Sequence, residues 1–169
     1  MRNKIIAIVG LLLITWTAQA QTTNYQAYSV FVYGLSKYLS WPPSSKQEFL
    51  IAVVGKSKAY DEMQKGLTGK AVNGLPIRVI QIESLSGDLE PNILYISDGK
   101  SNMIEELQKA TATKPVLIIG EREGLFRRGA GISFTAVDGK LRIDINNQEL
   151  SSRQIKTSKQ LTALVNESI

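Results

Sequence analysis

Short apolar runs alternate with amphipathic segments along the middle of this 169-residue chain, and this alternation restricts its fold more than any other feature. Residues 49–54, 93–96 and 116–119 are nearly continuous apolar runs, which is typical of strands buried on both faces of a sheet. Residues 57–67 and 102–110 instead carry apolar side chains at helical spacing. Strands that alternate with helices in this way predict a mainly parallel sheet with helices on both faces. We therefore expect an α/β fold.

A longer helix is predicted ahead of the first strand. From Asn24 onward, apolar residues recur at offsets of three and four as far as Leu39. Trp41-Pro42-Pro43 ends this pattern, because a proline disfavours helical geometry in the residue before it. Further along, Asn73-Gly74 predicts a turn that leads into a strand over residues 76–82.

The pattern changes near the end of the chain. Residues 132–137 and 140–145 alternate with period two on either side of Asp138-Gly139, which predicts an antiparallel hairpin. A C-terminal helix is predicted from three apolar residues, Leu161, Leu164 and Val165. No repeat and no long linker divides residues 21–169, so we expect them to form a single domain.

Residues 1–20 have the three parts of a secretory signal peptide. Arg2 and Lys4 give a positive start, an apolar run follows over residues 5–14, and Ala18-Gln19-Ala20 forms a small-x-small exit. The apolar run has only about half of the roughly 20 residues that a membrane-spanning helix needs. We therefore expect this leader to be cleaved and the remaining chain to be exported.

The sequence contains neither cysteine nor histidine. Disulfides and thiol redox switching are therefore excluded, and the usual ligands of zinc, copper and iron are missing. Mechanisms that need a histidine base beside a serine or cysteine are excluded as well. We expect no metal and no cofactor. Without the leader the net charge falls from +5 to +3, which is too small to indicate nucleic-acid binding.

Gly55, Lys56 and Ser57 are candidate ligand-binding residues. They leave a predicted strand and open a predicted helix, whose free N–H groups favour an anion. The turn is not a Walker A loop, because Leu50 stands where that motif needs its first glycine. The alternative is an ordinary turn in which Ser57 caps the helix, and capping is the commoner role for a serine at this place.

Carboxylates offer an acid–base alternative, but no pattern brings them together. Asp144 alternates with apolar neighbours and so belongs on the polar face of the predicted hairpin. Glu121 and Glu123 flank Arg122 in a loop, and Asp138 lies in a turn. We expect these groups to be solvated rather than catalytic, and we expect no enzymatic activity.

The first predicted helix is apolar on more than one face. Val30 and Tyr33 share a side with Lys37, opposite the stripe that would pack on the sheet. A helix that is apolar all round either lies centrally in the core or shares its second face with a partner. Both alternatives stay open, and they make Val30, Tyr33 and Lys37 candidate partner-binding residues.

The order of these segments resembles the YfiR/HmsC family of exported proteins, which are small α/β domains. The resemblance covers roughly residues 25–165 and rests on the shared order and spacing of its motifs. Residues 67–77 are similar to the family's glycine-lysine-x-valine-x-glycine-x-proline signature. The other segments that carry the resemblance are 28–38 with Trp41-Pro42, 49–55, 94–97, 124–126, 129–134, 142–146 and 158–161.

This resemblance implies a periplasmic regulator that binds the periplasmic part of a membrane-anchored diguanylate cyclase and restrains it, which lowers cyclic-di-GMP and biofilm output. It does not imply an enzyme. Disulfide-dependent control, discussed for relatives that carry cysteines, cannot apply to a chain with none.

Two hypotheses about function follow. In the first, the face with Val30, Tyr33 and Lys37 docks a membrane partner or a second copy of the chain. In the second, the protein is a periplasmic sensor that holds a small anionic ligand at the turn after residues 49–54. The two are compatible, because a sensor must also pass on its signal.

Overall fold

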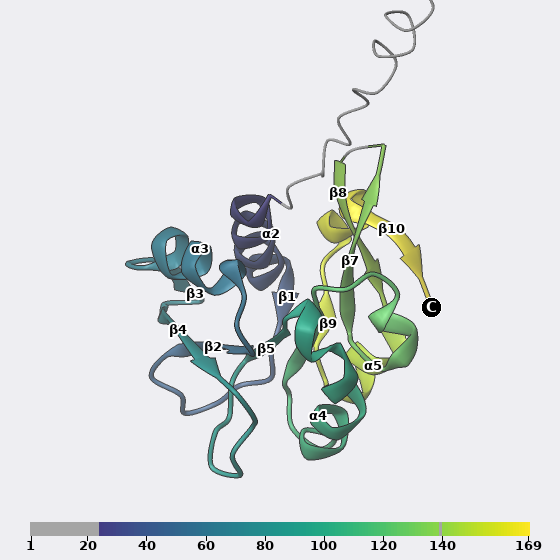
Figure 1. Ribbon diagram of the computed structural model, residues 1–169. Coiled ribbons are helices and arrows are strands. Elements are labelled where there is room, and N and C mark those ends of the chain that lie inside the picture. Colours follow the sequence, from purple (N-terminus) through teal and green to yellow (C-terminus); the bar gives the residue numbers. More distant parts are fainter. Residues whose placement is uncertain (1–23, 139) are drawn as a thin grey trace, which may run out of the picture.

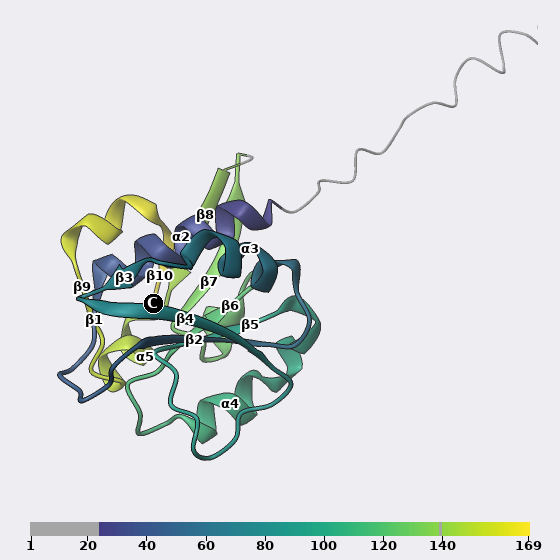
Figure 2. The same ribbon diagram turned by 90° about the vertical axis from the view of Figure 1, so that its left-hand side faces the viewer.

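The computed structural model describes residues 24–138 and 140–169, so the predicted leader at residues 1–20 lies outside the described part. The described residues form one eight-stranded sheet between two layers of helices (Figures 1 and 2). The strand order is β10-β8-β7-β6-β5-β2-β4-β3, and a separate two-stranded sheet joins β1 to β9. The predicted α/β fold is confirmed, with a mainly parallel sheet, helices on both faces and an antiparallel hairpin towards the C-terminus.

The strands of the described chain are β1 (Leu39–Ser40), β2 (Phe49–Val54), β3 (Ala71–Val72), β4 (Leu75–Ile82), β5 (Ile93–Ile96), β6 (Leu117–Gly120), β7 (Ile132–Val137), β8 (Lys140–Ile145), β9 (Lys156–Thr157) and β10 (Val165–Ser168). The α-helices are α2 (Tyr25–Tyr38), α3 (Lys58–Leu67), α4 (Ile104–Ala110) and α5 (Asn147–Ser152). Three short 3-10 helices are η1 (Asp98–Met103), η2 (Leu125–Arg128) and η3 (Lys159–Leu164).

Strand β2 lies inside the sheet, and all six of its residues are buried. Its alternate side chains serve two separate cores. Phe49, Ile51 and Val53 pack with residues of α2 and α3, whereas Ala52 and Val54 pack with residues of α4. Figure 2 shows the same division, with α2 and α3 on one face of the sheet and α4 on the other. The continuous apolar run therefore predicted a strand buried on both faces correctly.

The chain changes direction across the sheet at β2. Helix α3 leads from β2 to β4 on one side, and the chain then returns to β5 on the other side of β2. Strand β2 pairs in parallel with both neighbours. The carboxyl ends of β2 and β5 therefore meet at a topological switch point, where open α/β sheets form their ligand crevices.

Both predicted turns are present. Asn73 and Gly74 adopt φ values of +51° and +81° between the paired strands β3 and β4. In the hairpin of β7 and β8, Val137 lies opposite Lys140 and Asp138 has a φ of +51°. Asparagine and aspartate tolerate this left-handed conformation better than other side chains, which is why the two turn predictions succeeded.

The structure defines the starts of helices α2 and α4 more closely than the sequence did. Helix α2 begins after Asn24, whose side chain accepts a hydrogen bond from the Ala27 backbone N–H at 3.2 Å. The predicted helix over residues 102–110 is α-helical only in α4, because the chain first forms η1. The short 3-10 segment ahead of α4 could not be separated from it by apolar spacing alone.

The predicted C-terminal helix is wrong. Residues 159–164 form only the 3-10 helix η3, and Val165 begins β10, which pairs in parallel with β8. The apolar spacing in this segment fits a single helical turn, but β8 has an outer edge whose backbone groups need partners. The Ile169 N–H continues the ladder by donating to the Ile145 carbonyl at 3.0 Å.

The expectation that Asp144 is a solvated hairpin residue is also wrong. Its side chain is buried, and its carboxylate accepts a hydrogen bond from the Asn166 amide at 2.9 Å. Alternation identified the face of β8 on which Asp144 lies, but β10 runs alongside and supplies Asn166. The segment that buries Asp144 was the one predicted to be a helix.

Arg153, at the end of α5, forms a buried ion pair and links α5 to the end of α4. Arg153 donates from Nε to Glu149 at 2.6 Å, and its Nη1 donates to the Thr111 carbonyl at 2.7 Å. Only 2% of the Arg153 side chain is exposed. Several donors of the guanidinium are therefore satisfied inside the protein, which is the condition under which a buried charge is tolerated.

We expect Arg153→Ala to lower the free energy of unfolding by about 3 kcal/mol, because it leaves the Glu149 carboxylate without its charged partner in a mostly buried place. Arg78→Ala is the matched control, since Arg78 pairs with Glu48 at 2.9 Å on the surface. It should cost less than about 1 kcal/mol. Urea unfolding measures both, and equal losses would contradict a special role for the buried pair.

Candidate functional site

The predicted ligand-binding turn lies at the switch point, directly after β2. Gly55 adopts a φ of +83°, and its N–H donates to the Ile82 carbonyl at 2.8 Å. A Cβ at this position would lie 2.4 Å from Cγ of Lys100 and 2.7 Å from Oγ of Ser97. Gly55 therefore allows the ends of three neighbouring strands to approach one another closely.

Ser57 caps helix α3. Its Oγ accepts a hydrogen bond from the Ala59 N–H at 3.1 Å and lies 3.1 Å from Oε2 of Glu121, to which it donates. Asp61 adds a second carboxylate in the first turn of the helix, and Lys56 is exposed beside it. These two carboxylates already provide the negative charge that a helix N-terminus favours, so they oppose the entry of a further anion.

Tyr95 lies at the same edge of the sheet and is fully buried. Its hydroxyl lies near the carboxylate of Glu121 and has no partner among the described residues within the usual distance and angle limits of a hydrogen bond. Burial, and secondly the charge of Glu121, raise the pKa of Tyr95 well above its usual value. The same two causes raise the pKa of the half-buried Tyr28. The sequence analysis did not single out Tyr95 or its position near Glu121.

The acidic residues considered in the sequence analysis lie in different surroundings. Asp98 pairs with Arg122 at 2.7 Å on the surface, and this contact lowers the pKa of Asp98. Glu123 and Asp138 are exposed, whereas Asp144 is held by Asn166. Within residues 24–138 and 140–169, no three acidic side chains come together in a way that could hold a metal ion.

The predicted partner-binding residues share one face of α2. Val30 is 65% exposed, Lys37 is exposed, and Tyr33 is half-buried. The Lys37 ammonium lies 4.2 Å from the centre of the Tyr33 ring, and the Lys70 ammonium lies 4.5 Å from it. Lys70 follows α3 and was missed by the sequence analysis, which considered α2 alone.

A groove of about 410 Å³ runs between α2 and α3 beside Val30. Gly66 of α3 makes the close approach of the helices possible, because a Cβ there would lie 2.7 Å from Oγ of Ser29. The groove is lined by Gln26, Ser29, Val30, Glu62, Lys65, Gly66, Leu67 and Lys70. The exposed side of α2 and this groove form one continuous surface, which we call the α2–α3 surface.

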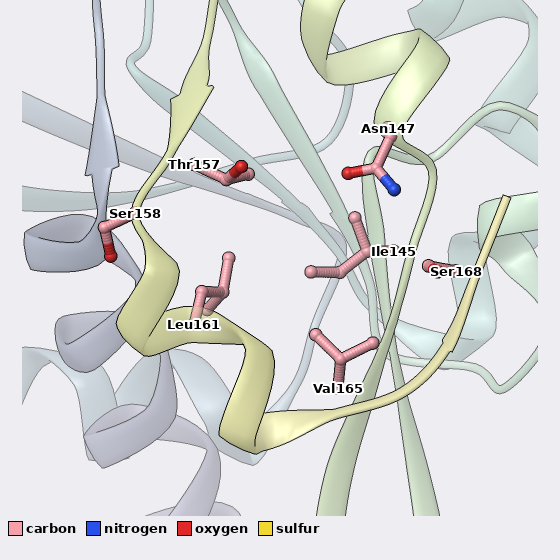
Figure 3. A pocket seen from close by; sticks show the side chains of 7 residues that line it. All are labelled: Ile145, Asn147, Thr157, Ser158, Leu161, Val165 and Ser168. Atoms are coloured by element: carbon pink, nitrogen blue, oxygen red, sulfur yellow. The ribbon is translucent and has the colours of Figure 1, made fainter.

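A second, smaller hollow of about 130 Å³ lies between β8, β9, η3 and β10 (Figure 3). Ile145 is at its centre, and Leu161 and Val165 lie beside it. Polar side chains of Asn147, Thr157, Ser158 and Ser168 complete the lining. The hollow is well below the roughly 300 Å³ at which pockets for drug-sized ligands begin. No sequence motif pointed to it, because it depends on the strand β10.

No helix among the described residues combines the length and the apolar character that crossing a bilayer requires.

Comparison with known proteins places the chain in a family. A family profile described as YfiR/HmsC-like matches residues 25–166, which is most of the sequence. The chain belongs to the YfiR/HmsC-like family. This family is one of periplasmic regulatory proteins, and the resemblance predicted from the sequence is therefore confirmed. A comparison with curated proteins finds no match.

Two solved structures share the fold of this YfiR/HmsC-like protein. One is a conserved domain protein from Vibrio cholerae, with 10% identity and a TM-score of 0.57. The other is an ABC domain from Streptococcus pneumoniae in complex with L-Trp, with 9% identity and a TM-score of 0.52. Each likeness covers 86% of this chain and 60% of the other chain, so the protein spans less than two thirds of the length of either.

We expect Gly55→Ala to destabilise this YfiR/HmsC-like protein by about 2 kcal/mol, since the new Cβ is strained at a positive φ and collides with Lys100. Gly34→Ala is the matched control, because Gly34 lies within α2 and a Cβ there would meet nothing within 4 Å. That change should stabilise the protein by up to about 1 kcal/mol. Thermal unfolding measures both, and a neutral Gly55→Ala would refute the packing role.

We expect Tyr95→Phe to leave stability at pH 7 unchanged to within about 0.5 kcal/mol, because the buried hydroxyl has no hydrogen-bond partner in the described chain. In the wild type, stability should fall as the pH rises above about 10, since an unfolded tyrosine ionises there while folded Tyr95 stays protonated. The variant should lose less stability at high pH. Unfolding curves between pH 7 and 11 test this, and an unchanged alkaline loss would contradict it.

Proposed function

We propose that this protein is a non-enzymatic periplasmic regulator that binds the periplasmic part of a membrane-anchored diguanylate cyclase and restrains it. Membership of the YfiR/HmsC-like family over residues 25–166 carries this proposal. Release of the cyclase would then raise cyclic-di-GMP and promote biofilm formation. The predicted signal peptide agrees with this function, because it would bring the protein to the compartment where such a cyclase presents its outer part.

The α2–α3 surface is the proposed contact with the cyclase. Val30 is the most exposed large apolar residue among the described helices and strands, and Tyr33 and Lys37 extend the same face. Aromatic residues that are partly exposed next to aliphatic ones are common at the centre of protein interfaces. Val32 and Leu35 of the same helix are fully buried in the core, so α2 is held firmly while it presents this face.

A small-ligand sensor is the alternative function. The likeness to a domain solved with L-Trp supports the fold and not a ligand for this chain. At the turn of Gly55, Lys56 and Ser57, the serine is engaged with α3 and with Glu121. Lys56 is the one residue of this turn whose side chain is free to meet an anion, and we therefore favour the regulator.

The proposal is tested in cells in which the gene for this protein is deleted. We expect cyclic-di-GMP to rise on deletion, and we expect no rise when the gene for the partner cyclase is deleted as well. The cyclase in question is the one that copurifies from membranes with the wild-type protein. An unchanged cyclic-di-GMP level after deletion, or the lack of any copurifying cyclase, would contradict the proposed function.

Val30→Glu should weaken binding to that cyclase at least tenfold, because it places a charge in an apolar contact. Val30 is 65% exposed, so the fold should be unaffected. Asn102→Glu adds the same charge on η1, on the other face of the sheet, and serves as the control. Copurification with equal yield for both variants would refute a contact through α2.

A further inference from the structure

Two lysine ammonium groups approach one aromatic ring on the α2–α3 surface. Those of Lys37 and Lys70 lie 4.2 and 4.5 Å from the centre of the Tyr33 ring. Neither lysine has a carboxylate within ion-pairing distance in the part of the chain that the structure describes. Both ammonium groups therefore lie next to the same ring without a carboxylate partner, and a carboxylate from outside would be attracted to them.

The groove between α2 and α3 continues from this charged end. Lys70 lines the groove, and so do the exposed Val30 and the backbone of Gly66. Further along, Lys65 is neutralised by Glu62 at 3.1 Å. Lys70 thus brings uncompensated positive charge to one end of the groove, and Val30 is an exposed apolar side chain in its lining. A ligand that carries an aliphatic side chain and a carboxylate would match both features.

We infer that the α2–α3 surface binds an acidic segment of the partner protein, with an aliphatic side chain next to Val30 and Gly66 and one or two carboxylates paired with Lys37 and Lys70. This inference rests on the proposed function, since the partner is the periplasmic part of the cyclase. The Tyr33 ring holds both ammonium groups in place through cation–π contacts. The mature protein's net positive charge favours the approach of such a segment.

The experiment measures the affinity of the full mature protein for the purified periplasmic part of the cyclase by calorimetry at low and high salt. The test variant is the double substitution Lys37→Glu and Lys70→Glu. We expect it to bind at least tenfold more weakly at low salt and to lose the salt dependence of the wild type. The control is Lys109→Glu combined with Lys140→Glu, since these exposed lysines have no ion pair with any described residue and are not on α2 or α3. The control should bind like the wild type.

Several results would overturn the inference. If the test and control variants lose affinity equally, net charge alone matters and the surface is not specific. If the test variant binds like the wild type, the cyclase contacts another surface while the proposed function stands. If sedimentation shows that the test variant loses self-association but keeps its affinity for the cyclase, the surface belongs to a second copy of the chain. Failure of the wild type to bind would contradict the proposed function itself, together with this inference.

Thermal unfolding checks that the test variant is folded, so that a loss of binding cannot be due to unfolding. Both lysines are exposed, so the test variant should unfold within a few degrees of the wild type. Restoring positive charge with Lys37→Arg and Lys70→Arg should return binding to within a few-fold of the wild type, because arginine also stacks on an aromatic ring. Folded arginine variants that fail to bind would contradict recognition by charge.

Discussion

The fold depends on one strand that is buried on both faces. Strand β2 has no exposed residue, and its alternate side chains belong to two different cores. Because the chain has no cysteine, these two cores must hold the domain together without covalent links. Strand β2 also sets the direction of the chain, since α3 leads from it to β4 on one side and the chain then returns to β5 on its other side.

The same arrangement positions the α2–α3 surface. Helix α3 is the crossover that follows β2, so its place beside the sheet is fixed by the pairing of β2 with β4. Helix α2 lies against α3 at the close approach of Ser29 and Gly66, and both helices bury one side in the same core. The outward sides of the two helices are left to form a groove, with Lys37 of α2 and Lys70, which follows α3, near one end.

The sequence allowed the middle of the fold to be predicted well, because buried strands and amphipathic helices have distinct apolar periods. The prediction failed after β8, where the apolar spacing of residues 161–165 fits a helical turn as well as a strand entry. Pairing with the free edge of β8 favours the strand over the helix. The local sequence gives no information about that edge. Likewise, α2 could be identified as two-faced from Val30 and Tyr33, but Lys70 comes from a different segment and no pattern within α2 could point to it. The position of Tyr95 near Glu121 could not be predicted for the same reason, because the two residues come from different segments.

The pairing of β1 with β9 joins Leu39, at the end of α2, to Thr157. Almost the entire sheet lies in the chain between these two points, so the pairing closes a very long loop. Contacts between segments so far apart in the sequence slow folding, because loop closure costs entropy before the contact gains any free energy. The C-terminal end of α2 is therefore held by residues that lie close to the C-terminus of the chain.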